Sequence, residues 1–192
     1  GVRWVSLDAP LVRPTACTPC RGSTNLKNAY ERAVGADRIW NEGPKYLQGQ
    51  GIGVAVVDSG MNPADDYYNL DGTSRLITSV QFNNGYNQSI YDGYGHGQHV
   101  AGIVGGNGRH DNGAYMGIAP MVNLINVKVS DDQGAATASN VVKGLQWVND
   151  NKNTYNIRVV NLSLNSGVPA SYNVDPIDAA VEILWFNKVV VV

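Results

Sequence analysis

The fold class of this chain is decided by a short stretch at residues 54–60, which reads VAVVDSG. Its first four residues form an unbroken apolar run, which is typical of a strand buried on both faces, as in a parallel sheet. Asp58 ends that run abruptly and precedes a Ser-Gly pair. Chemistry in open parallel sheets gathers beyond the carboxyl ends of the strands, so Asp58 is the first candidate for a functional residue.

Strands and helices alternate along the rest of the chain. Three further strands are predicted at residues 122–129, 159–164 and 189–192. The apolar run at 189–192 fits an interior strand buried on both faces. One neighbour would be the strand at 159–164, and the other would lie beyond this chain or be missing. Helices are predicted between the strands at residues 95–106, 137–149 and 175–187. In the second of these helices, apolar residues recur at three- and four-residue spacing. Such alternation implies right-handed crossovers and a parallel sheet covered by helices, so the sequence predicts an α/β fold.

A second motif lies at residues 95–102, which read GHGQHVAG. It places His96 between two glycines at the start of a predicted helix. The glycines remove side-chain bulk, so another chain can approach the imidazole closely. A carboxylate that accepts the other ring N–H would fix the tautomer of a catalytic His, and Asp58 is the obvious candidate for that carboxylate.

Each residue of this pair has a simpler interpretation on its own. An Asp that closes a strand is commonly a turn former, and His96 could be one surface histidine among three. The functional interpretation therefore rests on the two motifs occurring together and in this order.

Together the motifs resemble those of the subtilisin-like serine proteases, the subtilases. Residues 56–60 resemble the strand end that carries the catalytic Asp of the family, and residues 95–102 resemble the helix start that carries its catalytic His. Residues 116–120 resemble the loop leading into the next strand, and residues 159–164 resemble the strand lining the first specificity pocket. The resemblance covers residues 30–192 and implies a three-layer subtilisin-like fold with a mainly parallel central sheet, incomplete at the C-terminus.

The resemblance also implies roles for individual residues. Asp58 would orient His96, and His96 would act as general base and then as general acid in peptide-bond hydrolysis through an acyl-enzyme. A peptide or protein substrate would lie as an added strand between two walls of the cleft. The residues of these walls are Gly134, Ala135 and Ala136 on one side and Ser163, Leu164 and Asn165 on the other.

The main departure from the family concerns the nucleophile. No Gly-Thr-Ser-Met or Gly-x-Ser-x-Gly sequence occurs, and Ser23, Ser163 and Ser166 lie in the wrong places. The nucleophilic Ser and the oxyanion Asn are expected beyond Val192, in a C-terminal segment or a second chain. Gln98 also departs from the family, which usually has Thr or Ser there.

Two interpretations of the whole chain follow. The first is the N-terminal portion of a secreted or extracellular subtilisin-type serine endopeptidase. The second is a non-catalytic, subtilase-like subunit with a structural or binding role in a larger assembly.

Residues 1–25 are predicted to be an N-terminal strand and linker, separate from the peptidase portion at 26–192. The strand is similar to the last strand of a subtilase propeptide with its tail, and a plain N-terminal arm is the alternative. Cys17 and Cys20 in this segment are candidates for a local disulfide, or two idle thiols, rather than a redox pair, because the residues before them read as a linker.

Composition excludes other classes. The 14 Lys and Arg residues against 16 Asp and Glu residues give a net charge of −2, which argues against a nucleic-acid binder. No apolar run approaches the roughly 18 residues of a membrane span. The expected chemistry requires no cofactor, and the resemblance allows structural calcium at Asn107, Asp111 and Asn112.

Overall fold

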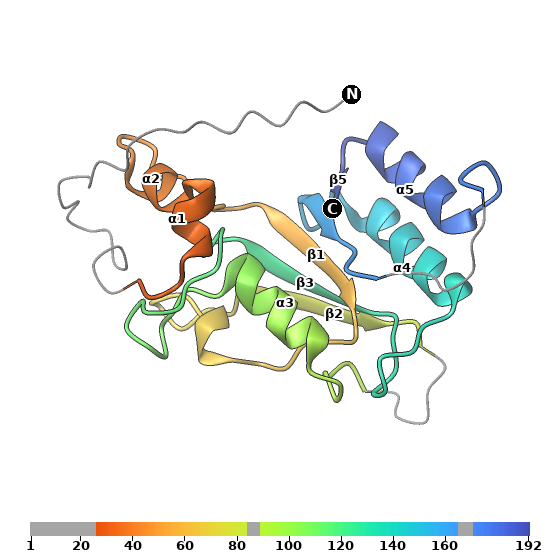
Figure 1. The fold of residues 1–192 in the computed structure, drawn as a ribbon, viewed down its shortest axis with the longest axis horizontal. Helices are drawn as coiled ribbons and strands as arrows, with labels where there is room; N and C mark the ends of the chain where they lie inside the picture. The colour runs from red at the N-terminus through yellow and green to blue at the C-terminus, as the bar shows by residue number, and fades with distance from the viewer. Residues whose placement is uncertain (1–25, 84–88, 165–170) are drawn as a thin grey trace.

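A computed structural model of the chain describes residues 26–83, 89–164 and 171–192. Within these residues, strands alternate with helices (Figure 1). The strands are β1 (Gly53–Asp58), β2 (Leu76–Gln81), β3 (Asn123–Lys128), β4 (Ile157–Asn161) and β5 (Val190–Val191). The helices are α1 (Tyr30–Val34), α2 (Ala36–Asn41), the 3-10 helix η1 (Asp65–Tyr67), α3 (His96–Gly105), α4 (Ala138–Asn151) and α5 (Pro176–Phe186).

The five strands form one parallel sheet in the order β2-β3-β1-β4-β5, which confirms the predicted α/β fold. β1 lies at the centre, and its residues pair with β3 on one side and β4 on the other. The sequence predicted four of these strands but not β2. This strand lies at the edge of the sheet and none of its residues is fully buried, so its apolar pattern is weak.

The sheet is covered on both faces, as the apolar run of β1 predicts. Val54 and Val56 pack in one core cluster with Ala101 of α3. Ala55 and Val57 point to the opposite face, in a second cluster with α4 and α5. Figure 1 shows α3 crossing in front of the sheet, with α4 and α5 side by side. The result is a three-layer arrangement.

The predicted strand near the C-terminus is present as β5, which pairs with β4 through Val159 and Val190. The burial on both faces that this run predicts is incomplete among the described residues, where the second neighbouring strand is missing. Val189 is 1% exposed, but Val190 is 46% and Val192 is 74% exposed. Val189 and Val191 pack with the core cluster that includes α5, whereas Val190 and Val192 alternate with them on the more exposed side.

The carboxyl edge of the sheet brings three elements together. β1 ends at Asp58, β3 ends at Lys128, and α3 begins at His96. α3 approaches β1 so closely that a Cβ on Gly97 would lie 2.4 Å from the carbonyl oxygen of Gly60. Only a glycine at this position allows the helix start to reach the strand end. None of the helices in the described part of the chain is long and apolar enough to cross a membrane.

Candidate active site

The two residues singled out by the sequence lie in direct contact at this edge. Nδ1 of His96 lies 2.8 Å from Oδ1 and 2.9 Å from Oδ2 of Asp58. The Asp58 side chain is 2% exposed, whereas that of His96 is 42% exposed. A carboxylate can only accept, so Nδ1 donates, and the neutral ring keeps its lone pair on Nε2. A partly exposed imidazole with this tautomer can take a proton from a group that approaches it.

Asp58 is held by the backbone that follows it. The N–H of Ser59 donates to Asp58 Oδ1 at 2.7 Å. The backbone carbonyl of Asp58 accepts the N–H groups of Val129 at 2.8 Å and Ser130 at 3.2 Å, just beyond the end of β3. The carboxylate therefore has a fixed place relative to both central strands.

Asp92 is a residue of this site that sequence reasoning missed. It is 8% exposed and accepts backbone N–H groups from the first turn of α3, at Gly95 and Gln98 among others. Gly95, at the N-cap position, has no side chain to do this. An Asp shortly before a helix is a recognised start signal, and it could have identified Asp92.

Lys128 is the second residue that sequence reasoning missed. It is fully buried at the end of β3, and its Nζ donates to the backbone carbonyls of Ser59 and, at 2.9 Å, Tyr91. Nζ also forms an ion pair with Asp132 at 2.9 Å. A buried ammonium needs such partners, and here they join three loops of the carboxyl edge.

The first predicted wall of the cleft is an ordered loop beside His96. Ala135 uses both of its backbone groups within the loop, since its N–H donates to Asp131 Oδ1 and its carbonyl accepts from Asp131 N, each at 2.8 Å. The Gly134 carbonyl and both backbone groups of Ala136 have no partner among the described residues. The ring of Tyr94 lies beside Gly134. The same ring lies near His96, with 6.5 Å between the centroids of the Tyr94 and His96 rings.

The second predicted wall is described only in part. Ser163 and Leu164 follow β4, and the exposed Ser163 hydroxyl accepts from Asn161 Nδ2 at 2.8 Å. Asn165 lies outside the described residues, as do Cys17, Cys20 and the predicted segment 1–25.

Residues 72–74 read Gly-Thr-Ser, the context in which the nucleophile of the family occurs, so their place in the fold matters. Ser74 lies before β2, at the amino end of a parallel strand, whereas His96 lies at the carboxyl edge. The Ser74 hydroxyl is 3.1 Å from both the backbone N and the carbonyl oxygen of Leu76. Ser74 is therefore on the wrong edge of the sheet to meet His96.

The predicted calcium residues follow α3, and Asn107 and Asp111 make hydrogen bonds within the protein. Asn107 Oδ1 accepts the N–H of Arg109 at 3.1 Å, and its Nδ2 donates to the Tyr68 carbonyl at 2.8 Å. The N–H of Asp111 donates to the Gly108 carbonyl. The described residues contain no cluster of three or more His, Cys, Asp or Glu side chains suited to a metal. Calcium at these positions stays a prediction.

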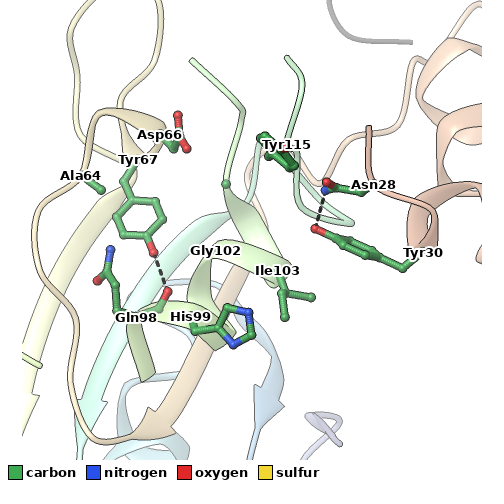
Figure 2. A pocket seen from close by; sticks show the side chains of 11 residues that line it. Asn28, Tyr30, Ala64, Asp66, Tyr67, Gln98, His99, Gly102, Ile103 and Tyr115 are labelled. Carbon is green, nitrogen blue, oxygen red and sulfur yellow. Dashed lines mark hydrogen bonds between the residues drawn. The ribbon is translucent and has the colours of Figure 1, made fainter. Parts of the chain in front are cut away.

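A groove of about 550 Å³ lies beside α3, apart from the Asp58–His96 pair. Figure 2 shows His99 and Ile103 of α3 in this groove, with Tyr30 on one side and Tyr67 on the other. Burial, with the neighbouring Glu31 carboxylate, raises the pKa of Tyr30 to about 12, and burial also raises the pKa of Tyr67. Both hydroxyls donate to backbone carbonyls, so these two tyrosines have structural roles.

An Asp–His pair at the carboxyl edge of a parallel α/β sheet defines a class of hydrolase-like site, and comparisons with known proteins identify the family. The model of the Subtilase family matches residues 49–189. The chain is 37% identical over 151 residues to the serine protease AprX of Bacillus subtilis (strain 168), covering 76% of this chain and 33% of that protein. It is 33% identical over 125 residues to subtilisin Savinase of Lederbergia lenta, covering 65% and 41%.

The fold comparison agrees with the sequence comparison. A crystal structure of a cold-adapted subtilisin-like serine proteinase matches with a TM-score of 0.54 and 27% identity, over 74% of this chain and 46% of that one. The chain belongs to the subtilase family. It spans less than half the length of each of these relatives.

Proposed function

We propose that this chain supplies the Asp–His part of the catalytic triad of a subtilisin-type serine endopeptidase. The observation that carries the proposal is the hydrogen bond of 2.8 Å between the buried Asp58 carboxylate and Nδ1 of the partly exposed His96. Serine proteases among its relatives support the assignment. The nucleophilic Ser and the oxyanion Asn would come from outside this sequence.

The chemistry assigns each residue a role. The Ser hydroxyl of the complement attacks the scissile carbonyl while His96 Nε2 takes its proton, and Asp58 stabilises the resulting imidazolium. His96 then gives the proton to the leaving amine, which breaks the C–N bond and leaves an acyl-enzyme. Water hydrolyses the acyl-enzyme by the same proton transfers, and this releases the acid and restores the Ser.

The loop at Gly134–Ala136 supports a substrate bound as an added strand. Groups that face a substrate strand recur at every second residue, because successive residues of a strand point their hydrogen-bonding groups to opposite sides. The unpartnered groups of Gly134 and Ala136, on either side of the satisfied Ala135, follow that period. The Tyr94 ring would flank the substrate beside His96.

The C-terminal part of the fold supports a complement, meaning the polypeptide segment or second chain that would carry the nucleophilic Ser and the oxyanion Asn. Five apolar side chains of α5 and of the residues that precede it are between 53% and 76% exposed. They are Tyr172, Val174, Ile183, Trp185 and Phe186. The open edge of β5 offers backbone groups to a further strand. A segment that carries the Ser could pair there and cover these side chains.

We further propose that the protein acts outside the cell. The support is a relative, the minor extracellular protease Epr of Bacillus subtilis (strain 168), which is 30% identical over 160 residues. In the same proposal, residues 1–25 include a propeptide tail that maturation removes.

The test is peptide hydrolysis by the chain together with its complement. His96→Ala and Asp58→Asn are each expected to lower kcat by about 10⁴-fold. His99→Ala, which changes another histidine of α3 that lies in the groove, serves as the matched control and should leave kcat within about twofold of the parent. A folded, assembled protein without hydrolysis would support the non-catalytic subunit instead.

A further inference from the structure

The hydroxyl of Ser59 and the carboxylate of Asp92 form a bridge between the strand that carries Asp58 and the helix that carries His96. Ser59 Oγ donates to Asp92 Oδ1 at 2.9 Å and accepts the backbone N–H of Gly97 at 2.9 Å. Ser59 directly follows Asp58, and Gly97 directly follows His96. The bridge therefore joins the two backbone positions next to the catalytic pair.

Asp92 fixes the rest of the first turn of α3. Its Oδ1 also accepts the N–H groups of Tyr94 at 3.1 Å and Gly95 at 2.8 Å, and its Oδ2 accepts the N–H of Gln98 at 2.7 Å. These N–H groups have no partner within the helix, and a carboxylate at this end also interacts favourably with the helix dipole. Both oxygens of Asp92 are in use, so the orientation of the carboxylate is determined.

Ser59 acts on the other member of the pair as well. Its backbone N–H donates to Asp58 Oδ1 at 2.7 Å, while its hydroxyl makes the bridge to α3. Ser59 is 1% exposed and Asp92 is 8% exposed, so bulk water is a poor substitute for either group.

Gln98, which departs from the family pattern, adds a second connection. Its Oε1 accepts the N–H of Asn62 at 2.7 Å, and Asn62 Oδ1 accepts the N–H of Asp92 at 3.1 Å. A shorter hydroxyl side chain at this position would have less reach toward Asn62. The Gln side chain thus anchors the loop of Asp92 to the chain that follows β1.

We propose that Ser59 and Asp92 are positioning residues for the Asp58–His96 pair. They hold the strand end and the helix start at the separation at which His96 Nδ1 meets Asp58, and they do so without touching the substrate. The inference rests on the proposed peptidase function for its kinetic consequence. Its structural part, the geometry of the pair, is independent of that function.

The experiment compares Ser59→Ala and Asp92→Asn with the parent protein, assembled with its complement. Asp71→Asn is the matched control, because Asp71 is also a carboxylate that accepts a backbone N–H, in an exposed turn before β2. Misplacing the pair is expected to lower kcat by about 10- to 100-fold in both variants, with KM within about twofold. In proton NMR, the low-field resonance of His96 Nδ1–H should shift or broaden. Ser59→Thr, which keeps the hydroxyl, should restore both.

Several outcomes would overturn the proposal. One is a parental kcat and an unchanged Nδ1–H resonance in Ser59→Ala and Asp92→Asn. Another is a raised KM with a parental kcat, which would place these residues in substrate binding. A third is an equal loss in the Asp71→Asn control. If Asp92→Asn does not fold, Ser59→Ala and its Thr rescue decide alone. If the parent protein hydrolyses no peptide, the proposed function fails, and the resonance of Nδ1–H still decides the positioning role.

Discussion

The first turn of α3 and the C-terminal region of α5 and β5 belong to the same α/β fold but differ in how far their groups are satisfied and buried. Around His96, backbone N–H groups are bound by Asp92 and Ser59, and the strand end they face is buried. On α5, large apolar side chains are exposed beside Asp178 and Glu182, with Trp185 62% and Phe186 75% exposed.

This difference shows which part of the proposed peptidase is complete within the chain. The hydrogen bonds that join Asp58, Ser59, Asp92 and the first turn of α3 satisfy the polar groups of these residues, so the geometry of the pair does not need a partner. An exposed cluster of large apolar side chains is typical of a protein interface whose partner is not bound. The Asp–His pair is therefore preformed, while the surface around α5 is expected to gain its stability on assembly.

The largest expected effect separates the two faces of α5. Leu184 is 1% exposed in the core cluster with Val160 and Val189, so Leu184→Ala should lower the free energy of unfolding by about 3 kcal/mol. Phe186→Ala, on the same helix, should change it by less than about 0.5 kcal/mol. The same Phe186 variant should weaken binding of the complement by about 2 kcal/mol. Urea unfolding and calorimetric titration measure the two quantities.

An equal loss of unfolding free energy in both variants would contradict this division. It would mean that the exposed face of α5 is already packed within the chain, and the comparison with the first turn of α3 would fail.

The next effect tests the close approach of α3 to β1. A Cβ on Gly97 would lie 2.4 Å from Gly60 O and 3.2 Å from Asp58 Cβ, so Gly97→Ala must push the helix away from the strand. We expect a loss of about 2 kcal/mol in unfolding free energy, together with loss of the Asp58–His96 hydrogen bond. Gly102→Ala is the control in the same helix, since its Cβ would meet nothing within 4 Å. It should stabilise the protein by about 0.5 kcal/mol.

Thermal unfolding and the NMR resonance of His96 Nδ1–H report both effects. A Gly97→Ala protein as stable as Gly102→Ala, with that resonance intact, would show that the helix and the strand can separate without disturbing the pair.

The same two regions show what the sequence could predict. β1 and the pair of Asp58 and His96 were predictable because a buried parallel strand has an unbroken apolar run and because the motifs are local. β2 was not, since an edge strand with partly exposed residues has no comparable pattern. The helix-start role of Asp92 is local and could be predicted, but its contact with Ser59 and the contacts of Lys128 join residues distant in the sequence, which spacing alone does not specify.

The C-terminal strand shows which structural property the local sequence does not determine. Its apolar run predicted both the strand and its pairing with β4, which the structure contains. The run also predicted burial on both faces, but the exposure of a residue depends on what other segments cover it. Local sequence carries no information on that, as Val190 and Val192 show.

A smaller effect tests the loop beside His96. Gly134 has a φ of +82°, and its Cβ would lie 2.7 Å from the Tyr94 ring. Gly134→Ala should therefore lower the unfolding free energy by about 1.5 kcal/mol, from backbone strain and from displacing the ring. In a Tyr94→Ala background only the strain remains, so the same change should be smaller, at about 1 kcal/mol. Urea unfolding of the four proteins measures this cycle, and an identical loss in both backgrounds would show that the ring yields without cost.

The smallest effect compares the two helix starts. α5 begins with a single side-chain cap, in which Asp175 Oδ1 accepts the N–H of Ile177 at 2.8 Å. Asp175→Ala should lower the unfolding free energy by about 1 kcal/mol, whereas Asp175→Asn should be nearly neutral, because Asn caps a helix about as well as Asp. At Asp92 the corresponding change to Asn should not be neutral. Both carboxylate oxygens there accept N–H groups, and an amide would turn its own donor toward one of them. Thermal unfolding of the two Asn variants side by side measures the contrast, and equal stability of both would mean that the start of α3 is capped no more specifically than that of α5.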